Sequence, residues 1–299
     1  MAIAQPGIFA LGSRYHHHIE FRVRPEASDA EIRGAIVDLF APAAVPGESN
    51  LVAGFASALW TRLHPVVSPA KLRPFPGISG ADGRGVPAKQ HDVWVWVHGG
   101  GADVVFDLAR RAASALLPVA AVADEQPGFI FRQSRDLTGF EDGTENPPID
   151  EAPEVALVPH GQAGAGGSYA IVMRWFHDLA AFDALSPEEQ QAVFGRTKDG
   201  SLEIDERPAT SHISRVVIDE GGGELEIFRR SSTFGDVRRH GLFFVAFSAD
   251  PDRFERMLGR MYGDDGITDR LTDFSRPEGG AYYFVPSLED LRGVQRSGK

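Results

Sequence analysis

The sequence predicts an α+β fold built from two similar halves, each with the element order β-α-β-β-α-β and an antiparallel sheet. Alternating apolar residues and short apolar runs mark strands in both halves, and a capping box that begins with serine marks a helix in each. The apolar strands that follow His91 and His240 lie half the chain apart, which indicates an internal duplication. Because this order is typical of a ferredoxin-like unit, we expect two such units side by side. The alternative is a chance similarity between two ordinary α+β halves.

The first strand is predicted at residues 15–23, where Ile19, Phe21 and Val23 alternate with Glu20 and Arg22. Such a strand is half-buried, with its polar residues facing away from the core. The three histidines inside it cannot converge on one metal ion, because neighbouring residues of a strand point to opposite faces. We interpret as structural the histidines that have no partner motif, namely His16, His17, His18, His64, His160 and His177.

The remaining elements of the first half follow in order. Ser28 and Glu31 form the capping box of a helix, and apolar residues then recur at helical spacing. Residues 92–97 alternate valine with tryptophan and predict a buried strand whose tryptophans belong to the core. From residue 103 onward a single apolar stripe predicts the second helix.

The second half repeats this order. Residues 168–175 predict its first strand, and Ser186 and Glu189 form the capping box of the helix after it. Residues 242–247 predict a buried strand, and apolar residues after Pro251 recur at the spacing of a helix.

This pattern divides the chain into three parts. We expect an N-terminal ferredoxin-like half at residues 1–130, a connecting segment at residues 131–167 and a C-terminal ferredoxin-like half at residues 168–299. The glycine-rich stretch at residues 161–167 lies near the expected joint.

Composition restricts the function. The 299 residues include 30 basic and 42 acidic side chains, which gives a formal net charge of −12, and there is no cysteine. Disulfides, cysteine nucleophiles and thiolate-bound metals are therefore excluded. The acidic balance argues against nucleic acid as a partner. Without a signal-peptide pattern or an apolar run long enough to cross a bilayer, we expect a cytoplasmic protein with no membrane partner.

Residues 133–147 form the most unusual stretch, because they place polar residues and two glycines between the halves. Gly139 and Gly143 flank Asp142 closely and allow positive φ angles or a close approach of the backbone to a ligand. The stretch lacks the spacing of an EF-hand calcium loop. We interpret it as a loop that holds a carboxylate, with an ordinary surface turn as the alternative.

Two segments of the second half add further candidates. His212 opens a predicted strand at residues 210–218, where a lone histidine is usually structural. Arg229 and Arg230 end a second apolar strand. The two-residue period of a strand places them on opposite faces, so one should point inward, where it needs an anion.

Together, the segments Gly-Phe-Glu-Asp-Gly-Thr-Glu-Asn-Pro at 139–147, Ser-His-Ile-Ser-Arg at 211–215 and Ile-Phe-Arg-Arg-Ser at 227–231 resemble the haem-dependent dye-decolourising (DyP-type) peroxidases. The compact length and the ending at residues 280–287 are similar to the short bacterial, B-type-like branch of that family. The resemblance covers nearly the whole chain. It implies two ferredoxin-like halves, with one haem b (iron protoporphyrin IX) per chain bound in the C-terminal half.

The resemblance also implies roles for individual residues. His212 is the expected iron ligand on the proximal side of the haem, and Asp142, Arg229 and Ser231 are expected on the distal, peroxide-binding side. Some relatives carry Asn at the position of Ser231. Arg229 is preferred over Arg230 as the distal arginine because of the motif and the strand period.

Supporting positions follow from the same resemblance. A carboxylate should accept a hydrogen bond from the second ring nitrogen of His212, and we assign this role to Asp273. Gly143 and Thr144 are expected over the haem face, and Arg196 beside a haem propionate.

The implied activity is a peroxidase that reduces hydrogen peroxide through a ferryl intermediate and oxidises dyes, phenols or similar donors one electron at a time. Asp142 would shuttle a proton, since a carboxyl group with an ordinary pKa near 3.9 is ionised even at mildly acidic pH. Arg229 would stabilise negative charge on the leaving oxygen. The expected partners are hydrogen peroxide, small-molecule reductants and further copies of the chain in a homo-oligomer.

Two alternatives remain at this stage. The chain could be a haem carrier or iron-releasing protein with incidental peroxidase activity. It could also be a cofactor-free ferredoxin-like binding module, with an acidic, metal-assisted site around Asp136, Glu141, Asp142 and Glu145.

Overall fold

The computed structural model describes residues 2–41, 49–80, 82–221 and 223–296. The N-terminal half contains, in order, η1 (Pro6–Ile8), β1 (Tyr15–Val23), α1 (Asp29–Leu39), β2 (Ser49–Phe55), α2 (Ser57–Leu63), η2 (Pro65–Val67), β3 (Ile78–Ser79), β4 (Gly85–Val86), β5 (Val93–Gly99), α3 (Ala102–Leu116) and β6 (Ala120–Phe129). Its main strands and helices follow the predicted order.

The second half begins after a short connecting helix, α4 (Ala152–Ala156). It contains β7 (Ser168–His177), α5 (Leu179–Asp183), α6 (Pro187–Phe194), α7 (His212–Val216), β8 (Phe228–Arg229), β9 (Ser232–Gly235), β10 (His240–Ser248), α8 (Asp252–Met261), η3 (Arg270–Asp273), β11 (Ser275–Val285) and α9 (Leu288–Arg296).

Nine strands from both halves form one continuous antiparallel sheet, and β3 and β4 pair with each other in a separate two-stranded sheet within the described residues. The N-terminal strands lie in the order β2-β5-β1-β6, and the C-terminal strands in the corresponding order β11-β7-β10, followed by β8 and β9. β2 pairs with β11 at Phe55 and Phe284, and β6 pairs with β9 at Phe129 and Thr233. Because the two half-sheets are joined by both of these strand pairs, the strands close into a barrel. Neither half-sheet has a free edge at these two junctions. The α+β class with two ferredoxin-like halves is confirmed.

The closure of the sheet explains one difference from the sequence prediction. Glu20 was expected to face away from the core, but it is 7% exposed, because the second face of β1 lines the barrel interior. Trp94 and Trp96 are fully buried in that interior, as predicted. His16 and His18 lie in the same layer and stack on these tryptophans.

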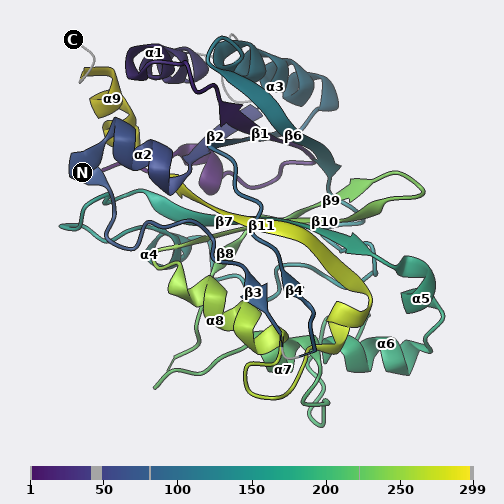
Figure 1. The fold of residues 1–299 in the computed structure, drawn as a ribbon. Helices are drawn as coiled ribbons and strands as arrows, with labels where there is room; N and C mark the ends of the chain where they lie inside the picture. The colour runs from purple at the N-terminus through teal and green to yellow at the C-terminus, as the bar shows by residue number, and fades with distance from the viewer. Residues whose placement is uncertain (1, 42–48, 81, 222, 297–299) are drawn as a thin grey trace.

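The helices cover the outer faces of the barrel. In the N-terminal half, α1 and α3 lie together over the sheet, and Ile32, Ile36, Val105 and Leu116 are buried against it. In the C-terminal half, α8 lies on the opposite side of the barrel, while α5, α6 and α7 extend along its lower edge (Figure 1). Both predicted capping boxes are present, at the start of α1 and of α6.

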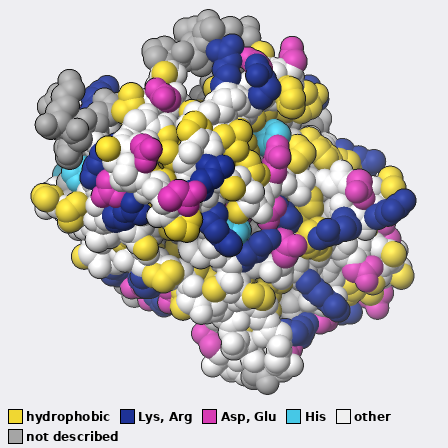
Figure 2. Space-filling model, turned by 45° about the horizontal axis from the view of Figure 1, so that its top comes forward, with side chains coloured by type: hydrophobic (Ala, Val, Ile, Leu, Met, Phe, Trp, Pro, Cys, Tyr) yellow, Lys and Arg dark blue, Asp and Glu magenta, His cyan; other side chains and the backbone are white. Residues whose placement is uncertain are grey.

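The surface mixes both charge signs. Figure 2 shows basic and acidic side chains interspersed over the face drawn, with scattered apolar residues between them. Among the helices of the described residues, none is both long and apolar enough to cross a membrane.

Candidate active site

A cavity lies against the outer face of the C-terminal sheet, between β7, β10, α7 and α8. Its walls are mainly apolar, and Leu242 and Phe244 of β10 are only half-buried where they face it. The other apolar lining residues are Phe140, Ile171, Met173, Trp175, Phe194, Ile213, Val216, Val217, Leu225, Ile227, Phe254, Met257, Leu258, Met261 and Leu271. The polar lining residues include His212, Asp142 and Arg229, so the structure brings the three principal candidates of the sequence analysis to one cavity.

His212 is held by a buried carboxylate, but not by the one that we expected. Its Nδ1 lies 2.7 Å from Oδ2 of Asp269, which is fully buried. The second oxygen of Asp269 accepts a hydrogen bond from the backbone N–H of Leu271, so both carboxylate oxygens are engaged. The assignment of this role to Asp273 is wrong, because Asp273 lies at the end of η3 and pairs with Arg84 at 2.6 Å. The bond to Asp269 orients the imidazole and leaves its Nε2 as the nitrogen available to a metal.

The segment that carries His212 is a helix rather than the predicted strand. Ile213, Val216 and Val217 are spaced i, i+3 and i+4, and all three line the cavity, Ile213 and Val216 from α7 and Val217 from its C-cap position. The β-branched residues that favoured a strand therefore form one face of a short helix. On the other side of α7, the buried Arg215 donates two hydrogen bonds to the carbonyl of Arg260, which ties the helix to α8.

The loop that carries Asp142 is held against β8 by a side chain that sequence reasoning missed. Asn146 Oδ1 accepts a hydrogen bond from the backbone N–H of Arg229, and its Nδ2 donates to the Arg229 carbonyl. The side-chain amide thus satisfies both backbone groups of Arg229, as a neighbouring strand would, and it holds the loop next to the arginine. Gly139 and Gly143 have φ angles of 87° and 88°, which confirms that both positions require the left-handed region.

Asp142 lies in the cavity wall with its charge only partly compensated. Burial raises the pKa of its carboxyl group above the ordinary value, the positive charge of Arg229 lowers it, and Asp136 raises it again. The net direction is upward. Asp142 therefore becomes ionised at a higher pH than the ordinary carboxyl pKa, used for the sequence prediction, implies.

Arg229 and Arg230 point to opposite sides, as the strand period predicts. Arg229 lines the cavity, whereas Arg230 lies in the barrel layer, with its guanidinium 5.2 Å from the ring centroid of Trp96. Arg230 donates to the backbone carbonyls of Ile8 and Ala10. Its partners are therefore backbone dipoles and aromatic faces rather than the anion that we expected for an inward arginine.

Ser231 follows on the same side of the chain as Arg229, because Arg230 and Ser232 both contact the barrel layer. Unlike Arg229, it is not among the described residues that line the cavity. Its Oγ is buried and has no hydrogen-bond partner among the described residues. A buried hydroxyl without a hydrogen-bond partner destabilises the folded state. A polar ligand at this position would remove that cost.

Of the three remaining candidates from the sequence, two line the cavity and one shapes the loop. Thr144 and Arg196 line the cavity. Arg196 already has carboxylate partners, since it pairs with Glu145 and lies 3.1 Å from Glu203. Gly143 serves the turn of the loop through its positive φ angle.

A histidine that we interpreted as structural also faces the cavity. His177, at the end of β7, places Nε2 at 2.9 Å from Asp136 and Nδ1 at 2.8 Å from Ser275. Burial favours the neutral form of Asp136, but the charge and hydrogen bond of His177 and two hydrogen bonds from Thr138 together outweigh it, and the pKa of that carboxyl group is lowered to about 2. Asp136 precedes His177 by 41 residues, so no local sequence pattern signals this pair.

The acidic residues of the loop do not form a cation site. Asp136 bonds to His177, Glu141 to Ser201 and Glu145 to Arg196. Within the described residues, no group of three or more potential ligands is placed to hold a metal ion. The proposed acidic, metal-assisted site therefore has no structural support.

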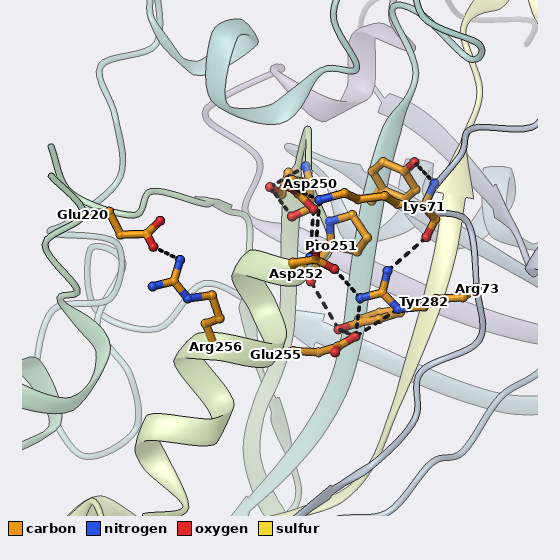
Figure 3. Close-up of polar contacts among 11 residues, drawn as sticks. Lys71, Arg73, Glu220, Asp250, Pro251, Asp252, Glu255, Arg256 and Tyr282 are labelled. Carbon is orange, nitrogen blue, oxygen red and sulfur yellow. Dashed lines mark hydrogen bonds and ion pairs between the residues drawn. The ribbon is translucent and has the colours of Figure 1, made fainter. Parts of the chain in front are cut away.

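The N-terminal half holds α8 in place through a cluster of ion pairs, which we call the charge clamp (Figure 3). Lys71 contacts Asp250 and Asp252 at 2.5 and 2.6 Å, and Arg73 contacts Asp252 and Glu255 at 2.5 and 2.6 Å. Since α8 supplies one wall of the cavity and holds α7, the clamp connects the N-terminal half to the helix of His212.

Comparison with known proteins agrees with this geometry. Residues 133–290 match the family model described as the C-terminal part of the Dyp-type peroxidases, and residues 27–130 match the N-terminal part. A dye-decolorizing peroxidase of Brevibacterium linens is 36% identical over 250 residues, which cover 81% of this chain and 68% of that protein.

Solved structures are similar over the whole chain. A putative DyP-type peroxidase from Shewanella oneidensis has a TM-score of 0.90 and 30% identity, covering 99% of both chains. A variant of DypB from Rhodococcus jostii RHA1, solved in complex with heme, has a TM-score of 0.90 and 32% identity, covering 98% of this chain and all of that one. A more distant similarity, 27% identity over 52% of this chain and 42% of the relative, links it to a deferrochelatase of Yersinia pestis. By sequence and by fold, the chain belongs to the DyP-type peroxidases, and it is an enzyme of that family.

Proposed function

We propose that this peroxidase binds one haem b in the cavity of its C-terminal half and uses it to reduce hydrogen peroxide at the expense of small donors such as dyes and phenols. The observation that carries the proposal is the placement of His212 in the same apolar cavity as Asp142 and Arg229. The heme complex of the Rhodococcus relative, at 32% identity over nearly the whole chain, supports the choice of cofactor.

The residues of the cavity fit haem. Apolar walls from β7, β10 and α8 suit a planar macrocycle, and a neutral imidazole is a common iron ligand. The bond from His212 Nδ1 to Asp269 makes Nε2 a stronger donor to iron. Next to Arg229 but outside the cavity lining, the buried hydroxyl of Ser231 has no partner among the described residues. Bound haem supplies an iron that takes oxidising equivalents from peroxide and passes them singly to donors.

Asp142 is the proposed proton carrier. Ionised Asp142 accepts a proton from hydrogen peroxide and returns it to the oxygen that leaves as water. Because the raised pKa of Asp142 keeps part of the carboxyl group protonated at acidic pH, the rate of this step should fall as the pH drops through that pKa.

Arg229 and Ser231 are proposed to hold peroxide in the reactive orientation. The guanidinium of Arg229 stabilises negative charge on the leaving oxygen. The bonds from Asn146 to the backbone of Arg229 fix the arginine relative to the Asp142 loop before peroxide enters. Ser231 Oγ offers a further hydrogen bond on the same side.

The test is a hemin titration followed by a turnover assay with hydrogen peroxide and a phenolic donor. We expect saturation at one hemin per chain and peroxide-dependent oxidation of the donor. Asp142→Asn should retain hemin but slow the reaction with peroxide by about 10²–10⁴-fold. Asp150→Asn, at an exposed position in the same connecting segment, is the control and should react normally. A protein that takes up no hemin, or an Asp142 variant with full activity, would refute the proposal.

A further inference from the structure

Two buried ionisable groups on the other side of the C-terminal sheet have no part in the function proposed above. Tyr283 of β11 is fully buried, and Glu20 of β1 is 7% exposed. The phenol of Tyr283 donates a hydrogen bond to Glu20 Oε1 at 2.5 Å. An O–H···O contact this short is typical of a charge-assisted bond between a hydroxyl and a carboxylate.

The pair lies within the aromatic layer of the barrel interior. The ring centroids of Tyr283 and Trp94 are 6.0 Å apart and the rings are stacked, and Trp94 stacks in turn on Trp96 and His18. Packing alone does not explain the pair, because phenylalanine at 283 with an apolar residue at 20 would fill the same layer without burying a carboxyl group.

The pair is also separated from the cavity by a single strand. Tyr283 is opposite Ala170 of β7 in the sheet register, and Ile171, the next residue along β7, lines the cavity from the other face. Electron transfer between the cavity and Tyr283 therefore needs to cross only the thickness of one sheet.

We propose that Tyr283 and Glu20 form an internal redox pair, in which Tyr283 gives one electron to the peroxide-oxidised active site and passes its phenolic proton to Glu20. The proposal rests on the proposed function, because hydrogen peroxide is the oxidant. In this step the O–H bond of Tyr283 breaks and an O–H bond forms on Glu20. Tyr283 becomes a neutral tyrosyl radical, and the active site recovers one of the two electrons that peroxide has removed.

The proton transfer makes the step possible in a buried place. A phenol that loses one electron becomes a radical cation, which is a very strong acid. Without a base to take its proton, it would remain as an uncompensated positive charge in the barrel interior. Glu20 provides the base, and the product is a neutral radical beside a neutral carboxylic acid. When a small-molecule donor later gives one electron to the tyrosyl radical, the phenolate that forms takes the proton back from Glu20, and the pair returns to its starting state.

The charges around the pair determine when Glu20 is available. The pKa of Glu20 is raised to about 7, mainly by burial and also by the nearby charge of Asp124 on β6. The hydrogen bond from Tyr283 and the charges of Lys89 and Arg174 act in the opposite direction. Burial, Glu20 and Asp92 raise the pKa of Tyr283, which therefore remains a phenol. Glu20 is thus a carboxylate able to accept the proton only at neutral and alkaline pH.

The neighbouring tyrosine provides a matched control. Tyr282 is also buried, but it faces α8, and its Oη lies 3.4 Å from Glu255 and from the Pro251 carbonyl (Figure 3). Tyr282 is adjacent to Tyr283 in the chain and also lies near a glutamate. It lacks a short hydrogen bond to that carboxylate.

The experiment uses the haem-loaded enzyme, mixed with one equivalent of hydrogen peroxide without any donor and frozen at once for electron paramagnetic resonance. We expect a tyrosyl signal in the wild type and in Tyr282→Phe, and its loss in Tyr283→Phe. Between about pH 6 and pH 8 the wild-type signal should grow about ten-fold, following the ionised fraction of a group with a pKa near 7.

Glu20→Gln tests the role of the base without removing the tyrosine. The amide oxygen can still accept the phenolic hydrogen bond but cannot take the proton, so the tyrosyl signal should be weak and independent of pH. Circular dichroism and the Soret absorption of each variant establish that it is folded and loaded.

The outcomes separate this inference from the proposed function. If peroxide changes the Soret absorption but the tyrosyl signal persists in Tyr283→Phe, or disappears in Tyr282→Phe instead, the redox pair is refuted and the peroxidase stands. If Glu20→Gln gives the wild-type signal at all pH values, the role of Glu20 is refuted. If peroxide leaves the loaded enzyme spectroscopically unchanged, both proposals fail.

Discussion

The two halves of the molecule have the same order of strands and helices but use the outer face of the sheet differently. In the N-terminal half, α1 and α3 both pack on this face, and residues such as Phe21 and Ile36 are buried in a continuous core. In the C-terminal half, α8 occupies the place of α3, while the segment in the place of α1 is divided into α5, α6 and α7. Leu242 and Phe244 therefore line a cavity. An identical topology yields a core or a binding site depending on whether one helix remains continuous.

The largest effect that tests this comparison is on stability. Ile36→Ala in the N-terminal core should lower the free energy of unfolding by about 2–5 kcal/mol, because it leaves a void among packed side chains. Leu242→Ala, at a half-buried position that faces the cavity, should cost the haem-free protein less than about 1 kcal/mol. Urea denaturation of the haem-free variants measures both values. Equal losses would mean that the two faces are packed alike.

Arg229, the proposed distal arginine, should give the next largest effect. Arg229→Leu should slow the reaction with hydrogen peroxide by about 10²–10³-fold, since it removes a charged donor from a buried site. It should also move the acidic limb of the pH–rate profile upward, because Arg229 lowers the pKa of Asp142. Stopped-flow measurements across the acidic range report both changes. Arg230→Lys, in the barrel layer, is the control; if it alone moved the limb, the roles of the two arginines would be reversed.

The carboxylate behind His212 should have a smaller effect. Asp269→Asn should weaken haem binding by about 10–100-fold, because the imidazole loses the partner that orients it and strengthens its donation to iron. Asp273→Asn removes only an exposed ion pair with Arg84 and should leave haem affinity unchanged. Competition for hemin with an apo-acceptor protein measures the difference, and a larger loss with Asp273→Asn would restore the assignment made from the sequence.

The charge clamp should give the smallest effect. Lys71→Gln and Arg73→Gln should each lower stability by about 0.2–1 kcal/mol, and less at high salt, because the pairs are partly exposed and screened. Arg111→Gln, which removes an ion pair within α3, is the matched control in the other half. If the clamp variants also release hemin faster than this control, the N-terminal half contributes to cofactor retention through α8.

The sequence predicted those features that depend on local periodicity or on a motif. The capping boxes, the buried tryptophan strand and the opposite orientations of Arg229 and Arg230 follow from spacing along one element. Closure of the barrel does not, since it depends on two contacts between strands that are far apart in the chain. The burial of Glu20 follows from that closure and was missed for the same reason.

The errors at the site also have physical causes. Asp269 is the N-cap residue of η3 and Asp273 is its last residue. Only the tertiary position of α7 selects Asp269 as the partner of His212. The β-branched residues after His212 fit a strand or one face of a helix equally well. Asn146 binds the backbone of a residue far along the chain, and no sequence pattern in one chain reveals such a contact.

Everything about the C-terminal cavity depends on iron being bound through His212, and one measurement tests this most directly. Wild-type protein and His212→Ala are each titrated with hemin, and the Soret absorption and the ligand-sensitive bands of the ferric protein are recorded. The wild type should bind one hemin with the spectrum of an imidazole-ligated haem, and His212→Ala should lose either the binding or that spectrum, with the ligated spectrum restored by added imidazole. An unchanged spectrum in His212→Ala would contradict the account.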